Sequence, residues 1–136
     1  MATAITFAGL AATAAAEGMI PGSDRGHADG FTLVGSYPGK DGFVAYVIHG
    51  TAYGQPASYS FHGVDCTRRK QVFYGSDEDF EVARDRANKN ASFPAQIFDD
   101  IAVLDRDEFY WHIAAHVCSA AHGIEFPPYD ERFANQ

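Results

Sequence analysis

The pattern of apolar and polar residues over 31–74 predicts four β-strands that lie close together in the chain. Residues 31–37 alternate between apolar and polar, and a Pro-Gly-Lys-Asp-Gly turn follows at 38–42. Residues 43–49 are a continuous β-favouring run, so the two segments predict a β-hairpin. Alternation resumes at Ser58 and leads to Cys66, and residues 68–74 form the fourth predicted strand. Because no helical segment separates these strands, their order favours an antiparallel sheet.

Helical patterns follow the predicted strands. Ser76 supplies a capping residue and acidic residues follow it, which predicts a mostly exposed helix over residues 79–89. Residues 96–104 fit either a short helix or a strand. Residues 105–108 resemble a capping box, and Gly123 is placed to end a helix over 107–121. The apolar stripe of this last helix consists of Phe109, Ile113, Val117 and Ala120.

These elements predict a single α+β domain over residues 31–123, with segments of different character on either side. The fold class is an antiparallel sheet of about four to six strands with a C-terminal helix packed across it. Residues 1–16 are apolar, small and uncharged and end in an A-x-A-like run, which is typical of a secretory signal peptide. An Ala-rich cytosolic N-terminus and a retained membrane anchor are the alternatives. Residues 17–30 are rich in Gly and predict a flexible linker, and residues 124–136 predict an irregular tail that packs an aromatic residue or two on the domain.

The composition narrows the classes of partner. The formal net charge is −8 and the isoelectric point is about 5.0, so the chain repels phosphate backbones and anionic lipid surfaces. Eleven Phe, seven Tyr and one Trp supply the apolar bulk that disordered chains lack. We therefore expect a folded domain whose partner is a protein, and we expect no binding to nucleic acid.

Two cysteines, Cys66 and Cys118, allow two interpretations. In an exported domain they predict one disulfide, which would tie the end of the third strand to the last helix. In a reducing compartment they would be two buried thiols that pack as small apolar residues. No Cys-x-x-Cys motif occurs, so neither a redox centre nor a zinc ribbon is indicated.

The residues around these cysteines resemble a known family. An initial Phe-Thr-Leu-Val-Gly-Ser strand at 31–36 is followed by Tyr-Ser-Phe-His-Gly-Val-Asp-Cys-Thr-Arg-Arg-Lys at 59–70 and by His-Val-Cys at 116–118. This order resembles the bacterial surface-adhesin protein E family of small exported domains with one disulfide. The resemblance covers roughly residues 31–119. It implies a sheet packed on a tethered helix, a location outside the cytoplasm, and binding to host or matrix proteins.

Candidate chemistry is concentrated on the last predicted helix. His112 and His116 are four residues apart on one helical face, a spacing that lets two imidazoles share a metal ion, and Glu108 extends the row. A solvated polar stripe is the simpler interpretation, because no HExxH motif and no fixed third ligand occur. If a metal were bound, zinc or copper would suit these ligands.

Other catalytic signatures do not occur in the sequence. There is no G-x-S-x-G nucleophile motif and no Gly-rich phosphate-binding motif. The carboxylate pairs Asp99/Asp100 and Asp105/Asp107 fit surface or capping roles better than a shared cleft. We therefore expect a protein that is not an enzyme and needs no cofactor.

The basic cluster of Arg68, Arg69 and Lys70 stands out on an acidic chain. It is either a contact site for an acidic partner or a charged edge strand that discourages sheet-to-sheet pairing. The sequence as a whole predicts a non-catalytic exported protein that binds other proteins at the bacterial envelope. A small periplasmic metal-binding protein or enzyme using His112 and His116, and an accessory subunit of a membrane complex, are the alternatives.

Overall fold

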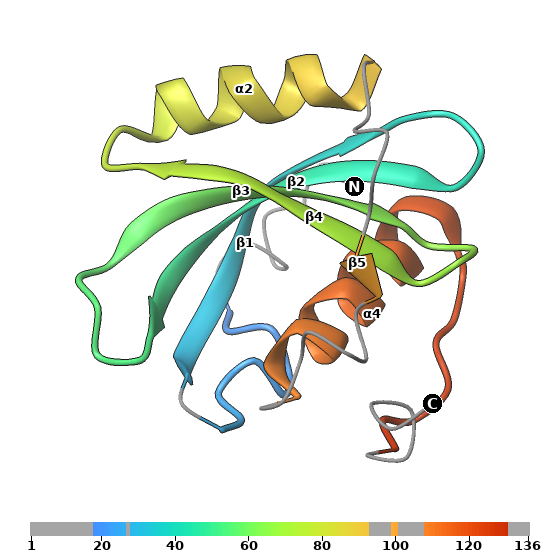
Figure 1. The fold of residues 1–136 in the computed structure, drawn as a ribbon, viewed down its shortest axis with the longest axis horizontal. Coiled ribbons are helices and arrows are strands. Elements are labelled where there is room, and N and C mark those ends of the chain that lie inside the picture. Colours follow the sequence, from blue (N-terminus) through green and yellow to red (C-terminus); the bar gives the residue numbers. More distant parts are fainter. Residues whose placement is uncertain (1–17, 27, 93–98, 101–107, 131–136) are drawn as a thin grey trace, which may run out of the picture.

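The structure is a computed structural model that describes residues 18–26, 28–92, 99–100 and 108–130 (Figure 1). Five antiparallel strands form one sheet in the order β1-β2-β3-β4-β5. The strands are β1 (Ala28–Pro38), β2 (Phe43–Ala52), β3 (Ser58–Asp65), β4 (Lys70–Asp77) and β5 (Asp99–Asp100), and the helices are α2 (Phe80–Ser92) and α4 (Phe109–His122). The predicted α+β fold with a C-terminal helix is confirmed.

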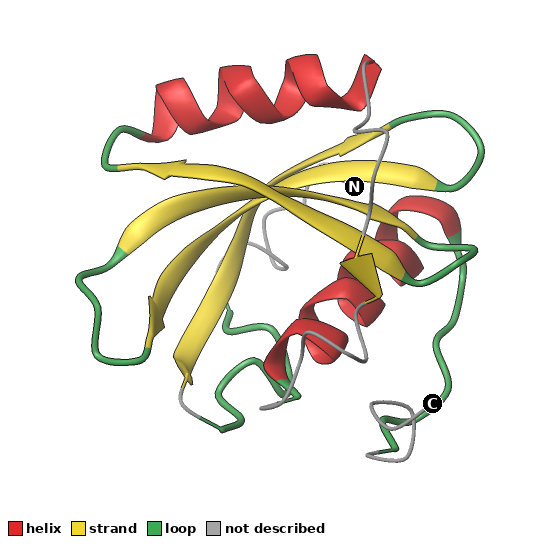
Figure 2. Ribbon diagram, viewed as in Figure 1, coloured by secondary structure: helices red, strands yellow, loops and turns green. Residues whose placement is uncertain are grey.

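The two helices cover opposite faces of the sheet, α2 above it and α4 below it in the view of Figure 2. Each helix has its own apolar cluster. The α2 cluster is built on Ala83 and Ala87, both fully buried, because small residues let this short polar helix approach the sheet closely. The α4 cluster is larger and includes Phe109, Trp111 and Ile113. The described part of the domain therefore has three layers.

The continuous apolar run of β2 explains why both faces are covered. Successive side chains of a strand point to opposite faces of the sheet. Val44, Tyr46 and Ile48 belong to the α4 cluster, whereas Ala45 and Val47 belong to the α2 cluster. All five side chains are at most 1% exposed, so this apolar stretch of β2 is covered by a helix on each side.

The domain begins earlier than the sequence predicts. Ile20 is 1% exposed and its N–H donates to the carbonyl of Phe31 at 2.8 Å, and Met19 forms a bridge with Thr32. The buried Ser23 hydroxyl accepts a hydrogen bond from Phe31 N–H at 2.9 Å. The segment expected to be a flexible linker is therefore part of the domain from Met19 onward, as far as the structure describes it. Its residues form hydrogen bonds with the edge strand β1, and Ile20 packs in the α4 cluster.

The helix ends also differ from the sequence prediction. Asp79, rather than Ser76, caps α2, since its carboxylate accepts a hydrogen bond from Glu81 N–H at 2.8 Å. Helix α4 ends at Gly123 as predicted, with a left-handed φ of 66°. Glu108 makes no side-chain cap to this helix, and Asp105 of the expected capping box lies outside the described residues.

The described part of the C-terminal tail packs on α4, as the sequence predicts. Phe126 and Tyr129 contact the ring of Trp111, with centroid distances of 5.3 and 5.8 Å. The indole N–H of Trp111 donates to the carbonyl of Pro127 at 3.1 Å. No helix among the described residues is long and apolar enough to cross a membrane.

We predict that Gly50→Ala destabilises the domain by about 2 kcal/mol, the usual cost of overpacking. A methyl group at Gly50 would collide with the Gly30 carbonyl and lie 3.0 Å from Phe31 Cα on the paired strand β1. Because these are backbone atoms, rotamer changes cannot relieve the contact. Urea unfolding of the variant measures the loss. Gly18→Ala, which meets no atom within 4 Å, is the control and is expected to change stability by less than about 0.5 kcal/mol.

Candidate functional site

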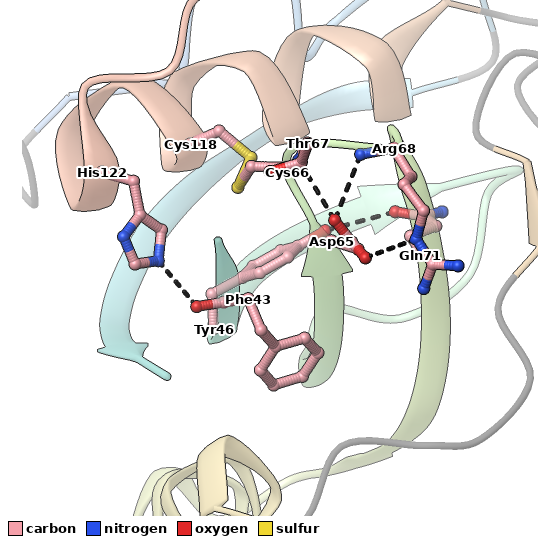
Figure 3. The surroundings of a disulfide bond; sticks show 9 residues. All are labelled: Phe43, Tyr46, Asp65, Cys66, Thr67, Arg68, Gln71, Cys118 and His122. Atoms are coloured by element: carbon pink, nitrogen blue, oxygen red, sulfur yellow. Dashed lines mark hydrogen bonds and ion pairs between the residues drawn. A yellow bond between two sulfur atoms is a disulfide. The ribbon is translucent and has the colours of Figure 1, made fainter. Parts of the chain in front are cut away.

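The two cysteines form the predicted disulfide (Figure 3). The Cα atoms of Cys66 and Cys118 are 5.6 Å apart, and both residues are at most 1% exposed. Near the same end of α4, the His122 ring Nε2 donates to the carbonyl of Phe43 at 2.7 Å. The C-terminal half of α4 is thus fixed to the sheet by a covalent bond and a hydrogen bond.

The basic cluster lies in the turn between β3 and β4 and takes part in local structure. Asp65 organises this turn by accepting hydrogen bonds from the backbone N–H groups of Thr67 and Arg68, each at 3.1 Å. The guanidinium of Arg68 forms a 2.8 Å ion pair with the same carboxylate, and that of Arg69 lies over the Trp111 ring at 5.9 Å. Lys70 is the first residue of β4 and lies opposite Asp100 of β5 in the register of the sheet. Arg68 is nevertheless 64% exposed at its side chain, so its contact with a partner stays a prediction.

The histidine row on α4 forms as a helical stripe but not as a metal centre among the described residues. His112 Nε2 lies 3.3 Å from the Glu108 carboxylate, so these two members are paired with each other. The Nε2 atom of His116 is buried without a hydrogen-bond partner, and this burial lowers the pKa of His116. No group of three or more His, Cys, Asp or Glu side chains within the described ranges is arranged to hold a metal ion.

A groove of about 350 Å³ lies on the α4 side of the sheet, between the first turn of α4 and strands β2 to β4. Its volume falls at the lower end of the range for small-molecule sites. Hydroxyl and amide groups occupy much of its lining, which includes Thr51, Gln55, Ser58, Ser60 and Ser76. None of the lining residues that the structure describes is charged. We call this feature the serine groove.

Aromatic rings flank the serine groove. Phe73 of β4 is 58% exposed, which is unusual for a large apolar side chain in a sheet, and Tyr110 of α4 faces the same groove. Both rings contact His62, with centroid distances of 5.2 Å to Phe73 and 5.9 Å to Tyr110. The position of Phe73 depends on a β-bulge, because His62 pairs with Phe73 while the preceding Phe61 pairs with Gly75.

His62 lies beneath these rings and is 1% exposed. It stacks on Tyr46 with a centroid distance of 5.2 Å and an interplanar angle of 10°. Neither ring nitrogen has a hydrogen-bond partner, and burial lowers the pKa of His62 to about 3. A neutral imidazole in an aromatic box therefore supports both flanking rings of the serine groove.

The turn between β2 and β3 borders the serine groove and holds an aromatic residue in a strained conformation. Ala52 and Gln55 of this turn line the groove, and Gln55 N–H donates to the Ala52 carbonyl at 3.1 Å. Between them, Tyr53 has a φ of 57° and is 58% exposed. The left-handed region costs a non-glycine residue about 1–2 kcal/mol, and such strain is often found at functional sites.

A second cavity, of about 780 Å³, lies between the β1–β2 turn and the end of α2. Its described lining consists of turn and helix-end residues such as Lys40, Asp41 and Asn88. These side chains have no aromatic ring or histidine beside them in that lining. The serine groove is therefore the better candidate for a binding site.

The serine groove is not predicted by the sequence, although two features of the chain point toward it. Ser58, Ser60 and His62 alternate along β3 and so share one face of the sheet. Phe73 is an aromatic residue in a segment that contains three basic residues. Neither signal shows that Tyr110, far along the chain, completes the site. No family model, curated protein sequence or solved structure matches the chain.

Proposed function

We propose that this protein is an exported, non-catalytic binding module of a bacterial envelope. The observation that carries the proposal is the buried Cys66–Cys118 disulfide. Disulfides form and persist in oxidising compartments outside the cytoplasm and are rare where thiols are kept reduced. The leader-like residues 1–16 and the resemblance to surface adhesins support the same compartment.

The serine groove supports the binding part of the proposal. Two large side chains, Tyr53 and Phe73, are each 58% exposed at or beside one concave site. Exposed aromatic residues grouped in this way are typical of recognition surfaces. The scaffold of the site includes β2, whose residues Val44 to Ile48 are buried, and the disulfide ties α4 to the sheet, so the site is largely formed before a ligand binds.

Trapping thiols in intact bacterial cells tests the proposed compartment. Intact cells that express the chain are denatured directly in an alkylating reagent without reductant, so that buried thiols react, and a parallel culture is fractionated; both are analysed by intact mass spectrometry. We expect the protein outside the cytoplasm, with both cysteines unmodified and a mass lower by two hydrogens than that of the same chain with reduced cysteines. A chain that starts at Glu17 after the initiator Met is the control, and it is expected to stay in the cytoplasm with alkylated cysteines. Full alkylation of the complete chain in intact cells would contradict the proposal.

A further inference from the structure

We propose that the serine groove binds a neutral carbohydrate, one or two sugar rings of an oligosaccharide. This inference rests on the proposed function as a binding module and names the ligand class of its site. It is carried by the combination of hydroxyl-bearing lining, exposed aromatic rings and uncharged surface at one concave place.

The polar lining matches the chemistry of a sugar. A sugar hydroxyl both donates and accepts hydrogen bonds, and it is best matched by groups that do the same. Ser58, Ser60 and Ser76 each offer a hydroxyl with one donor and two acceptor sites, and Gln55 offers an amide. The Thr51 hydroxyl donates to the Asp29 carboxylate at 2.7 Å, so its oxygen can accept a hydrogen bond from a sugar hydroxyl.

The aromatic residues match the other surface of a sugar. A pyranose ring presents its C–H bonds on its flat faces, and these are attracted to the negative face of an aromatic ring. Phe73 is 58% exposed and is supported from below by His62, so its ring is held in place with free area above it. Tyr110 stands at the α4 side of the same groove, also in contact with His62.

Charge separates a neutral sugar from the competing ligand classes. Acidic sugars, nucleotides and phosphorylated lipids need cationic side chains, and none lines the groove among the described residues. The net charge of −8 adds long-range repulsion of anions. An uncharged extended peptide is the remaining competitor, but several hydroxyls in a single groove satisfy a polyhydroxylated ligand better than an apolar side chain.

The test is an NMR titration of the ¹⁵N-labelled full chain with maltotriose, cellotriose and tri-N-acetylchitotriose. Each is added to about 10 mM, which detects dissociation constants near 1 mM. We expect at least one of them to shift the amide signals of Ser58, Ser60 and Phe73 saturably. Phe73→Ala is expected to weaken this binding by about tenfold, as the loss of one aromatic contact predicts. Phe73→Tyr keeps the ring and is expected to bind like the wild type.

Two further variants separate the groove from general effects on the fold. Ser76→Ala removes an exposed hydroxyl without altering the core, and it is expected to weaken binding several-fold. Met19→Ala removes a side chain that is 48% exposed outside the groove lining, and it is expected to leave binding unchanged.

Three results would overturn the inference. One is the absence of shifts with all three trisaccharides. Another is binding that Phe73→Ala and Ser76→Ala leave unchanged. The third is groove binding by the uncharged peptide acetyl-Gly-Trp-Gly-amide with no response to the sugars, which would leave the proposed binding module standing with a different ligand. Alkylated cysteines in intact cells, by contrast, would remove the proposed function whatever the titration shows.

Discussion

Replacing both cysteines by alanine is expected to lower the free energy of unfolding by about 4 kcal/mol. The disulfide closes a loop with a sequence separation of 52 residues, and it restricts the unfolded chain far more than the folded one. A loss of this size is a large fraction of the total stability of a domain, about 5–15 kcal/mol. Urea unfolding followed by circular dichroism measures it.

The urea dependence in the same experiment shows whether the disulfide acts on the unfolded chain. The unfolded double-alanine chain is less constrained and exposes more surface, so the dependence of the unfolding free energy on urea is expected to steepen. Wild-type protein unfolded in the presence of reductant is the control and is expected to match the variant. A difference under about 1 kcal/mol would contradict the prediction and show that packing alone holds α4 on the sheet.

Lowering the pH is expected to destabilise the wild-type protein through His62, by about 1.4 kcal/mol for each pH unit well below pH 6.5. The unfolded chain takes up a proton on this residue as the pH falls through 6.5. The folded protein does not until about pH 3, because burial lowers the pKa of His62 to that value. Between these values the unfolded state binds one more proton, so stability is lost as the pH falls, by up to about 5 kcal/mol.

His62→Phe isolates this contribution. The difference in unfolding free energy between variant and wild type is expected to grow in favour of the variant from neutral pH downward. Near neutral pH the variant is expected to be at least as stable, since it removes two buried nitrogens that have no hydrogen-bond partner. Ser60→Ala, two residues earlier on the same face of β3, changes no titratable group and is the control. Parallel pH profiles for wild type and His62→Phe would contradict the prediction.

The sequence predicts the strands well because their patterns are local, yet it assigns some side chains to the wrong face. Simple alternation from Phe31 to Tyr37 places both residues on one face. In the structure a register shift between Leu33 and Gly35 intervenes, so Phe31 belongs to the α4 cluster and Tyr37 contacts the α2 cluster. One extra residue in a strand reverses every side chain beyond it, and no sequence pattern marks where that residue lies.

The site is harder to predict than the fold because its parts come from distant segments. The disulfide between the two cysteines, which the sequence predicts for an exported domain, is confirmed. The expected row of His112 and His116 shares a helix face, but His112 is paired with Glu108. The groove instead joins β2, β3 and β4 with the first turn of α4, and only the docking of α4 brings Tyr110 toward Phe73.

By itself, the sequence determined the four main strands and the two helices, and it offered a disulfide as one of two interpretations of its cysteine pair. These follow from side-chain period, turn residues and cysteine count, which act over a few residues or through a covalent bond. Only the tertiary structure decided that α2 and α4 lie on opposite faces, that residues from Met19 onward belong to the domain, and that His62 is buried beneath an open groove. Those outcomes depend on which apolar surfaces meet across the folded chain, and local patterns do not specify such contacts.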